Sequence, residues 1–231
     1  MSLSNESFEL KSQVILITGA AQGIGAAVAK AAAKAGATIV LLDKNVPLLE
    51  AVYDDIEIST NTKPAIYPLD LKGASATDYH ELARVIAKQY QRLDAVVHCA
   101  ATLGQLAPVI NQDTKTWAET LHINLTACYL LTQACLPLLK QQTTSQLIFT
   151  TDSHSHNAYW GAYGISKAAI EALAGQLKAE LLAEGKVHVN IVDPGDVRTE
   201  LYARAYPAKS PELLTTANEA AKFFLDILTS K

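Results

Sequence analysis

Cysteine is scarce in this chain of 231 residues. It occurs only at Cys99, Cys128 and Cys135 and never in a C-x-x-C pair, which argues against a disulfide framework or a zinc site. We interpret the three residues as small buried hydrophobes. Runs of lysine and arginine are also missing, and the formal net charge is −4, so no basic surface for nucleic acid is expected. A small-molecule ligand is the better expectation.

A secretory leader and long apolar spans are equally missing. The first residues, "MSLSNESFELKSQ", have no basic start followed by an apolar run and a small-residue cleavage site, so no secretory signal is expected. A cytoplasmic location without membrane association follows by default. There is no repeat, low-complexity tract or linker, and 49% of the residues are hydrophobic. These features favour one globular domain over residues 1–231.

Apolar runs of strand length alternate with stretches of helical period along the chain. The strand-like runs include "VILITG", "ATIVLLD", "AIYPLD", "LDAVVHCA", "QLIFTTD" and "VHVNIVDPG", and a long helix is expected from about residue 115 to 140. Seven candidate strands separated by helices predict a three-layer α/β fold with a doubly wound parallel sheet of the Rossmann type. No strand pattern follows "FFLDILTSK", so a strand after the last helix is not expected.

The first strand-to-helix turn carries a glycine cluster. In "ILITGAAQGIGAAVAK", Gly19, Gly23 and Gly25 form a G-x-x-x-G-x-G pattern at the start of a helix. Glycines there allow a tight turn and close approach of the backbone to a diphosphate, which the helix N-terminus attracts. Asp43 ends the second strand, where a carboxylate can accept hydrogen bonds from an adenosine ribose. No Walker-type phosphate loop occurs anywhere. We therefore expect a dinucleotide.

A tyrosine and a lysine stand four residues apart in "YWGAYGISK". At this spacing Tyr163 and Lys167 share one face of a helix, so the ammonium can lie near the phenol. A positive charge at that distance favours the phenolate form. On a solvated helix surface the same pair would have no chemical role.

Taken together, these segments resemble the short-chain dehydrogenase/reductase family over nearly the whole chain. The matching segments are "TGAAQGIG", "YPLDLKG", "HCAA", "LHINLTA", the Tyr163 and Lys167 pair, and "NIVDPGDVRT", in the family's order. The resemblance implies hydride transfer between a nicotinamide cofactor and a carbonyl or secondary alcohol. It makes Tyr163 the general acid/base and Lys167 the group that lowers its pKa and holds the cofactor ribose. Asn124 would hold a helix kink and a water linked to the lysine.

The resemblance also implies a set of residues that bind the cofactor. They are Gly19, Gln22, Gly23, Ile24, Gly25, Asp43, Asp70, Leu71, Ala100, Tyr163, Lys167, Pro194, Gly195, Val197 and Thr199. Asp43 would repel a 2′-phosphate, whereas Lys44 would attract one. NADP-preferring relatives often have a basic residue where this chain has Gln22. We therefore expect NAD(H) rather than NADP(H).

Two departures from the family pattern concern the site. Where the family has a substrate-orienting serine, strand alignment gives Asp152, and Ser153 is the next hydroxyl. A carboxylate there would disfavour an alkoxide, so Ser153 is the preferred candidate for the fourth catalytic residue. The second departure is "HCAA", where the family typically has Asn-Asn-Ala-Gly. Cys99 replaces a polar side chain there, which bears on stability more than on chemistry.

Further expectations concern metals, the substrate and assembly. His154 and His156 are interpreted as pocket lining without a metal, because no third ligand is in view. The segment with Tyr202 and Tyr206 is expected to cover the pocket as a flap. The resemblance implies that two helices with small residues pair with their copies as a dimer contact, and the absence of a strand pattern after the last helix favours a homodimer over a tetramer. The small residues are Ala127, Cys128 and Ala134 on one helix, and Ala168, Ala172 and Gly175 on the other. The alternative function is a catalytically impaired dinucleotide-binding protein that senses redox state or binds a partner.

Overall fold

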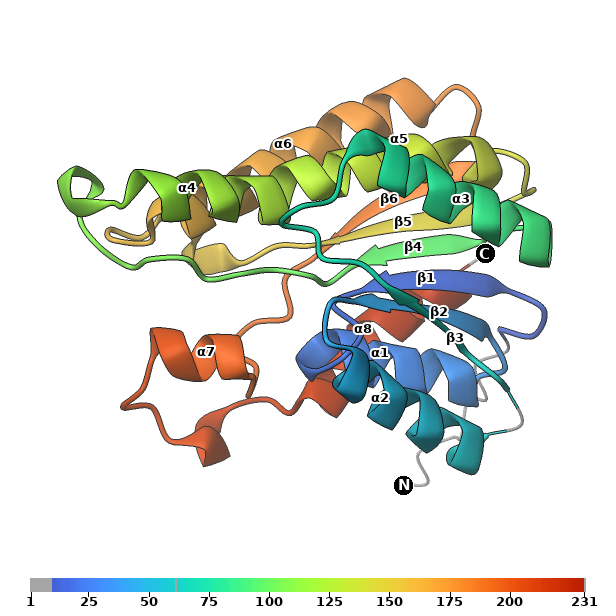
Figure 1. Ribbon diagram of the computed structural model, residues 1–231, viewed down its shortest axis with the longest axis horizontal. Helices are drawn as coiled ribbons and strands as arrows, with labels where there is room; N and C mark the ends of the chain where they lie inside the picture. Colours follow the sequence, from blue (N-terminus) through green and yellow to red (C-terminus); the bar gives the residue numbers. More distant parts are fainter. Residues whose placement is uncertain (1–9, 61, 231) are drawn as a thin grey trace.

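Six parallel strands form one sheet in the described part of the chain (Figure 1). The computed structural model describes residues 10–60 and 62–230. The strands are β1 (Val14–Thr18), β2 (Thr38–Asp43), β3 (Ala65–Pro68), β4 (Ala95–His98), β5 (Ser145–Thr150) and β6 (Val187–Val192), in the spatial order β3-β2-β1-β4-β5-β6. The fold class predicted from the sequence is confirmed. The predicted count of seven strands was wrong, because only six apolar runs pair in the sheet.

Helices cover both faces of the sheet. They are α1 (Gly23–Lys34), α2 (Val46–Ser59), α3 (Ala76–Tyr90), α4 (Thr114–Leu121), α5 (Ala127–Leu139), α6 (Gly161–Leu181), α7 (Glu200–Ala205) and α8 (Ala217–Thr229). Helices α1, α2 and α8 lie on one face, and α3, α5 and α6 lie on the other (Figure 1). Within residues 10–60 and 62–230, no strand follows α8, and no helix is both long and apolar enough to cross a membrane. The expectation about a secretory signal falls mainly on residues 1–9, outside the described residues.

The fully buried central strand β1 explains why these layers form. Val14 and Leu16 pack into the cluster formed with α3, α5 and α6, whereas Ile15 and Ile17 pack into the cluster formed with α1, α2 and α8. Successive side chains of a strand point to opposite faces, so an uninterrupted apolar run needs cover on both sides. The chain runs from β1 to β2 on one side, and β4 lies on the other side of β1. The order of the strands therefore reverses between β1 and β4, and this reversal leaves a crevice at the carboxyl ends of the strands, where ligands of such sheets bind.

A buried histidine links the sheet to α5. The His98 ring stacks on Phe149 with ring centroids 4.8 Å apart, and its Nε2 lies 3.0 Å from the Thr132 hydroxyl. Burial lowers the pKa of His98 from 6.5 to about 3. The neutral imidazole is therefore a structural part of the core, in the segment "HCAA" where the sequence departs from the family pattern.

His98→Asn is expected to flatten the pH dependence of stability in acid. A histidine whose pKa is lower in the folded than in the unfolded chain stabilises the fold fully above about pH 6.5, and loses that stabilisation as the pH falls toward 3. The free energy of unfolding should thus be about 3 kcal/mol lower at pH 4 than at pH 7 on account of this residue. Urea unfolding at several pH values measures it. The substitution of the exposed His80 by Asn is the control. If His98→Asn leaves the pH dependence of the free energy of unfolding unchanged, His98 is not the buried neutral histidine described above.

Candidate active site

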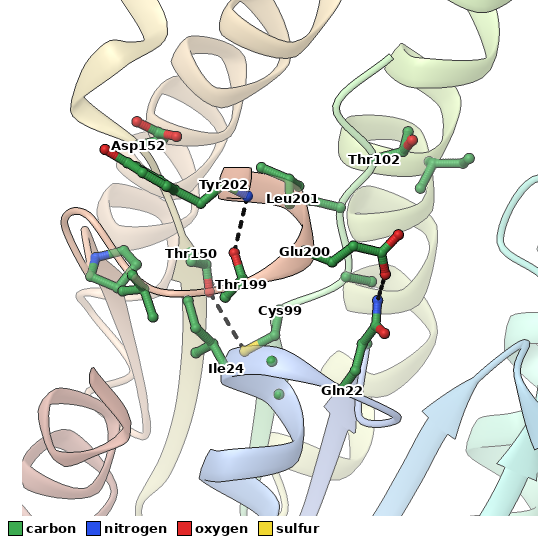
Figure 2. A pocket seen from close by; sticks show the side chains of 18 of the residues that line it. Gln22, Ile24, Cys99, Thr102, Thr150, Asp152, Thr199, Glu200, Leu201 and Tyr202 are labelled. Carbon is green, nitrogen blue, oxygen red and sulfur yellow. Dashed lines mark hydrogen bonds between the residues drawn. The ribbon is translucent and has the colours of Figure 1, made fainter. Parts of the chain in front are cut away.

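A cavity of about 640 Å³ opens at the carboxyl ends of the strands (Figure 2). Its walls come from the β1–α1 turn, the ends of β2, β4 and β5, helix α6 and the segment after β6. All fifteen residues that the sequence resemblance implied for cofactor binding line this cavity. The structure therefore brings them together, and their role in binding stays a prediction.

The β1–α1 turn is shaped by glycines that have no room for a side chain. Gly19 has φ = +67°, and a Cβ there would lie 2.8 Å from the backbone of Ala100. A Cβ on Gly25 would overlap the carbonyl of Gly19 itself. The turn consequently packs backbone against backbone, and the N-terminus of α1 opens into the cavity.

Asp43 and Lys44 lie side by side on the cavity wall at the end of β2. One carboxylate oxygen of Asp43 accepts a hydrogen bond from the Asn45 amide at 3.0 Å, and the other accepts one from the Ala21 amide at 3.5 Å. Backbone amides therefore fix this carboxylate against the glycine turn. Lys44 is exposed, so its ammonium group can move toward a ligand.

Tyr163 and Lys167 stand together on α6 at the inner end of the cavity. The Lys167 ammonium lies 5.6 Å from the centroid of the Tyr163 ring and donates a 2.8 Å hydrogen bond to the carbonyl of Thr150. Only 4% of Tyr163 and 5% of Lys167 is exposed. The spacing in "YWGAYGISK" thus brings the phenol and the ammonium to one face of the helix, as the sequence predicted.

The Tyr163 hydroxyl donates a 2.8 Å hydrogen bond to Asp152. Burial, followed by the Asp152 carboxylate, raises the pKa of Tyr163, and burial lowers the pKa of Lys167. The lowering of the Tyr163 pKa predicted from Lys167 is therefore not found, because burial and Asp152 raise this pKa. Tyr163 is held as a protonated phenol.

Asp152, and not Ser153, occupies the position beside the tyrosine. Ser153 is exposed and lies off the cavity, and its backbone amide donates to the Asp193 carboxylate at 3.0 Å. The chain after β5 continues directly into a tight turn, Ser153–His156, whose first residue is Ser153 and whose N-cap is Asp152. The preference for Ser153 in this place was wrong, and the strand alignment to Asp152 fits the structure.

Asn124 lies behind the cavity in a π-helical turn, His122–Thr126, between α4 and α5. Its side chain accepts a hydrogen bond from the Thr102 amide and donates to the Thr102 carbonyl and to the Ser166 hydroxyl, at 2.8 to 3.0 Å. The expected helix kink is present, because the π turn interrupts the long helix predicted from residue 115 to 140. Asn124 thereby braces the cavity wall at Thr102 against α6.

Sequence reasoning missed several partners of the site. The His154 ring donates from Nδ1 to Asp152 at 2.8 Å and stacks on Trp160. Asp193 accepts hydrogen bonds from the Ser153 and Gly195 amides. The position of Asp193 directly before Pro-Gly at the end of β6 could have marked it, since that end meets the cavity. In the described part of the chain, no three His, Cys, Asp or Glu side chains are grouped to hold a metal ion.

The segment after β6 covers part of the cavity. Glu200, Leu201 and Tyr202 of α7 line it, and the Gln22 amide donates to the Glu200 carboxylate at 3.3 Å (Figure 2). The β1–α1 glycine turn and α7 are therefore in contact across the opening of the cavity. The placement agrees with the flap expected from the sequence.

Comparison with known proteins agrees with this arrangement. The family model for short chain dehydrogenases matches residues 13–210. The chain belongs to the short-chain dehydrogenase family. It is 36% identical over 218 residues to the oxidoreductase YciK of Escherichia coli K12, covering 94% of this chain and 86% of YciK.

Two solved short-chain dehydrogenase structures bear on the cofactor. One, from Shigella flexneri, is complexed with NADP; it has 35% identity and a TM-score of 0.93, covering 96% of this chain and 93% of its own. Another, from Escherichia coli CFT073, is complexed with NADPH; it has 36% identity, a TM-score of 0.93 and the same coverage. The expectation of NAD rather than NADP is contradicted by these two complexes. It rested on Asp43, which would repel a 2′-phosphate, and on Gln22 in place of a basic residue.

Proposed function

We propose that this short-chain dehydrogenase is a single-domain, NADP(H)-dependent oxidoreductase of a small molecule. It transfers a hydride between the nicotinamide and a polar double bond of the substrate. In the simplest case the substrate is a carbonyl compound, and the reduced product is the corresponding secondary alcohol. The observation that supports this most is the buried pair Tyr163 and Lys167 at the inner end of the cavity whose other end is the glycine turn. A cytoplasmic location stays a prediction.

The residues around the cavity fit a dinucleotide. The backbone at Gly19 and Gly25 has no room for a Cβ atom, so the turn can come close to a ligand. This shape suits a diphosphate bound at the N-terminus of α1. Asp43 and Lys44, which line the cavity, would contact the adenosine ribose and its 2′-phosphate, and Lys167 would contact the nicotinamide ribose. When bound, the cofactor supplies or accepts the hydride. The cavity volume of about 640 Å³ leaves room for a small substrate beside Tyr163.

The protein contributes the proton and the positioning. For a carbonyl, the protonated Tyr163 hydroxyl donates its proton to the substrate oxygen as carbon receives the hydride. Lys167 then stabilises the phenolate that is left, because its ammonium lies next to the ring. Asn124 keeps Thr102 and α6 in place around the reacting atoms.

Lys44→Ala is expected to weaken NADPH binding by about 10- to 100-fold, the range for loss of a charge-assisted contact, and to change NADH binding less than threefold. The reason is that the 2′-phosphate is the group that distinguishes the two cofactors. Fluorescence titration with each cofactor measures the effect. Lys34→Ala, at the far end of α1, is the control. An equal change for both cofactors would show that Lys44 does not read the phosphate.

The second candidate is a protein that binds the dinucleotide without turnover. The observation in its favour is the carboxylate of Asp152 in place of a substrate-orienting hydroxyl. A turnover screen over ketones, alcohols and imines with both cofactors separates the two. Saturable NADPH binding without turnover in the whole screen would favour the binding protein.

We also propose a homodimer, on revised grounds. Ala127, Cys128 and Ala134 of α5 are buried in the chain's own core, so the reading that α5 offers them to a partner was wrong. On α6, Ala172 and Gly175 are exposed, as is 47% of Ile165. Small exposed residues allow two helices to approach closely.

Light scattering at micromolar concentration should give about twice the chain mass of 24.8 kDa. Ile165→Glu and Ala172→Glu together should give the monomer, because they place charges in the proposed helix contact. A wild-type monomer would contradict the proposal.

A further inference from the structure

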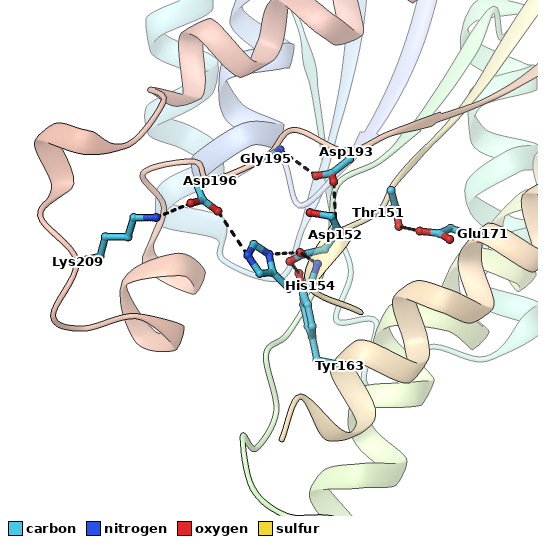
Figure 3. Close-up of polar contacts among 10 residues, drawn as sticks. Thr151, Asp152, His154, Tyr163, Glu171, Asp193, Gly195, Asp196 and Lys209 are labelled. Carbon is cyan, nitrogen blue, oxygen red and sulfur yellow. Dashed lines mark hydrogen bonds and ion pairs between the residues drawn. The ribbon is translucent and has the colours of Figure 1, made fainter. Parts of the chain in front are cut away.

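The substrate side of the cavity is acidic next to the proton donor. Asp152 lies on the cavity wall, and one of its oxygens, Oδ2, accepts the Tyr163 hydroxyl at 2.8 Å (Figure 3). Asp193 lines the same wall from the end of β6. The Lys167 ammonium, which lies 5.6 Å from the centroid of the Tyr163 ring, donates to the carbonyl of Thr150. A substrate atom that contacts the Tyr163 hydroxyl therefore lies beside a carboxylate.

Asp152 is held firmly in this orientation. Its second oxygen, Oδ1, accepts hydrogen bonds from the His154 backbone amide at 2.9 Å and from His154 Nδ1 at 2.8 Å (Figure 3). The His154 ring stacks on Trp160 with centroids 5.4 Å apart, and its Nε2 lies 3.8 Å from Asp196. With Oδ1 occupied twice, the carboxyl group cannot turn away from the site without losing both bonds. Oδ2 stays directed at the reacting atoms.

A fixed carboxylate has opposite effects on two kinds of hydride acceptor. Hydride addition to a carbonyl carbon moves an electron pair onto oxygen, and a neighbouring carboxylate repels the negative charge that develops there. A protonated imine carries a positive charge before hydride addition and a neutral nitrogen after it. The same carboxylate binds and stabilises the protonated form, which is the reactive one.

We propose that the reacting bond of the natural substrate is a protonated C=N bond, whose N–H donates to Asp152 Oδ2 beside the Tyr163 hydroxyl. This inference rests on the proposed function and names the substrate class of the same site. In the step, a hydride leaves the dihydronicotinamide and forms a C–H bond at the imine carbon. The π pair of the C=N bond becomes the lone pair of the amine nitrogen, and the nicotinamide is left oxidised. No proton has to leave Tyr163.

Two further features agree with a cationic substrate. Two aromatic side chains, Tyr163 and Tyr202, line the same cavity as Asp152. Such rings attract cations. In addition, burial and Asp152 raise the pKa of Tyr163, which keeps it a hydrogen-bond donor instead of a phenolate.

The test compares a cyclic imine, 2-methyl-1-pyrroline, with a ketone of matched ring size, cyclopentanone. NADPH oxidation is followed for the wild type, Asp152→Ser and Asp152→Asn, each with its NADPH dissociation constant and melting temperature. The wild type should show kcat/KM for the imine at least 100-fold above that for the ketone. Asp152→Ser should lower the imine value at least tenfold and raise the ketone value at least tenfold. Asp152→Asn, which keeps the shape and removes the charge, should also lower the imine value.

Three results would overturn the proposal. A wild type that prefers the ketone, with Asp152→Ser reducing both activities, would show that Asp152 acts as a protonated acid toward a carbonyl. Equal imine activity in wild type and Asp152→Asn would show that the charge has no role. If NADPH binds but is oxidised with neither compound, and no deuterium passes from labelled NADPH, the proposed function fails and this inference fails with it.

Discussion

Tyr163→Phe is expected to lower the rate of ketone reduction at least 100-fold and to leave NADPH binding within about twofold. The change removes the only transferable proton on this side chain and keeps the ring that packs on Trp160 at 5.4 Å. A positioned acid of this kind contributes roughly 100- to 10,000-fold. Steady-state kinetics with cyclopentanone and a cofactor titration measure the two effects.

Tyr159→Phe is a matched control, because that hydroxyl belongs to a side chain of the same motif with 64% of its surface exposed. It should change neither quantity. A loss below tenfold in Tyr163→Phe would remove Tyr163 as the proton donor. With 2-methyl-1-pyrroline the loss should be much smaller, because a protonated imine needs no proton from the protein.

Gly25→Ala is expected to destroy the cofactor site. The new methyl group would overlap the carbonyl of Gly19, so the β1–α1 turn has to move away from the place where a diphosphate would bind. We expect NADPH affinity to fall at least 100-fold and the free energy of unfolding to fall by about 1–3 kcal/mol, as for other overpacked interiors. Calorimetric titration and urea unfolding measure these changes.

Gly73→Ala is the control, because a Cβ there meets no atom within 4 Å. It should leave NADPH affinity unchanged. NADPH binding of Gly25→Ala within threefold of wild type would mean that the glycine turn does not hold the cofactor.

Features that depend on short-range spacing could be predicted from the sequence. The glycine turn and the pair Tyr163 and Lys167 follow from strand and helix periods, because both periods fix which side chains share a face. The common cavity followed as well, since parallel strands put their carboxyl ends at one edge. The helix expected from about residue 115 to 140 spans α4, the π turn and α5 for the same reason, although its interruption at the π turn was not predicted as a boundary.

Features that depend on the path of a loop, or on several groups competing for one side chain, could not be predicted from the sequence. Ser153 and Asp152 are neighbours in sequence, and only the tight turn after β5 decides which one faces Tyr163. The pKa of Tyr163 is raised by burial, by Asp152 and by Asp193, and none of these contributions can be read from the spacing of Tyr163 and Lys167. Asp43 and Gln22 indicated NAD, because the sequence does not show how the exposed Lys44 and the Asp43 carboxylate lie on the cavity wall.

The small residues of α5 could likewise not be assigned from the sequence to the core or to a dimer contact. Ala127 and Cys128 are small, and small residues suit both a partner helix and the chain's own sheet. Only the three-dimensional packing assigns them to the core.

Hydride transfer by this protein can be measured with NADPH that carries deuterium at both C4 positions of the dihydronicotinamide. Wild-type protein is incubated with the labelled cofactor and with either 2-methyl-1-pyrroline or cyclopentanone, and the products are analysed by mass spectrometry. The account predicts one deuterium on the former C=N carbon, in an amount equal to the NADPH oxidised, and far less product from the ketone. Saturable binding of the labelled cofactor with no deuterium in either product would contradict it.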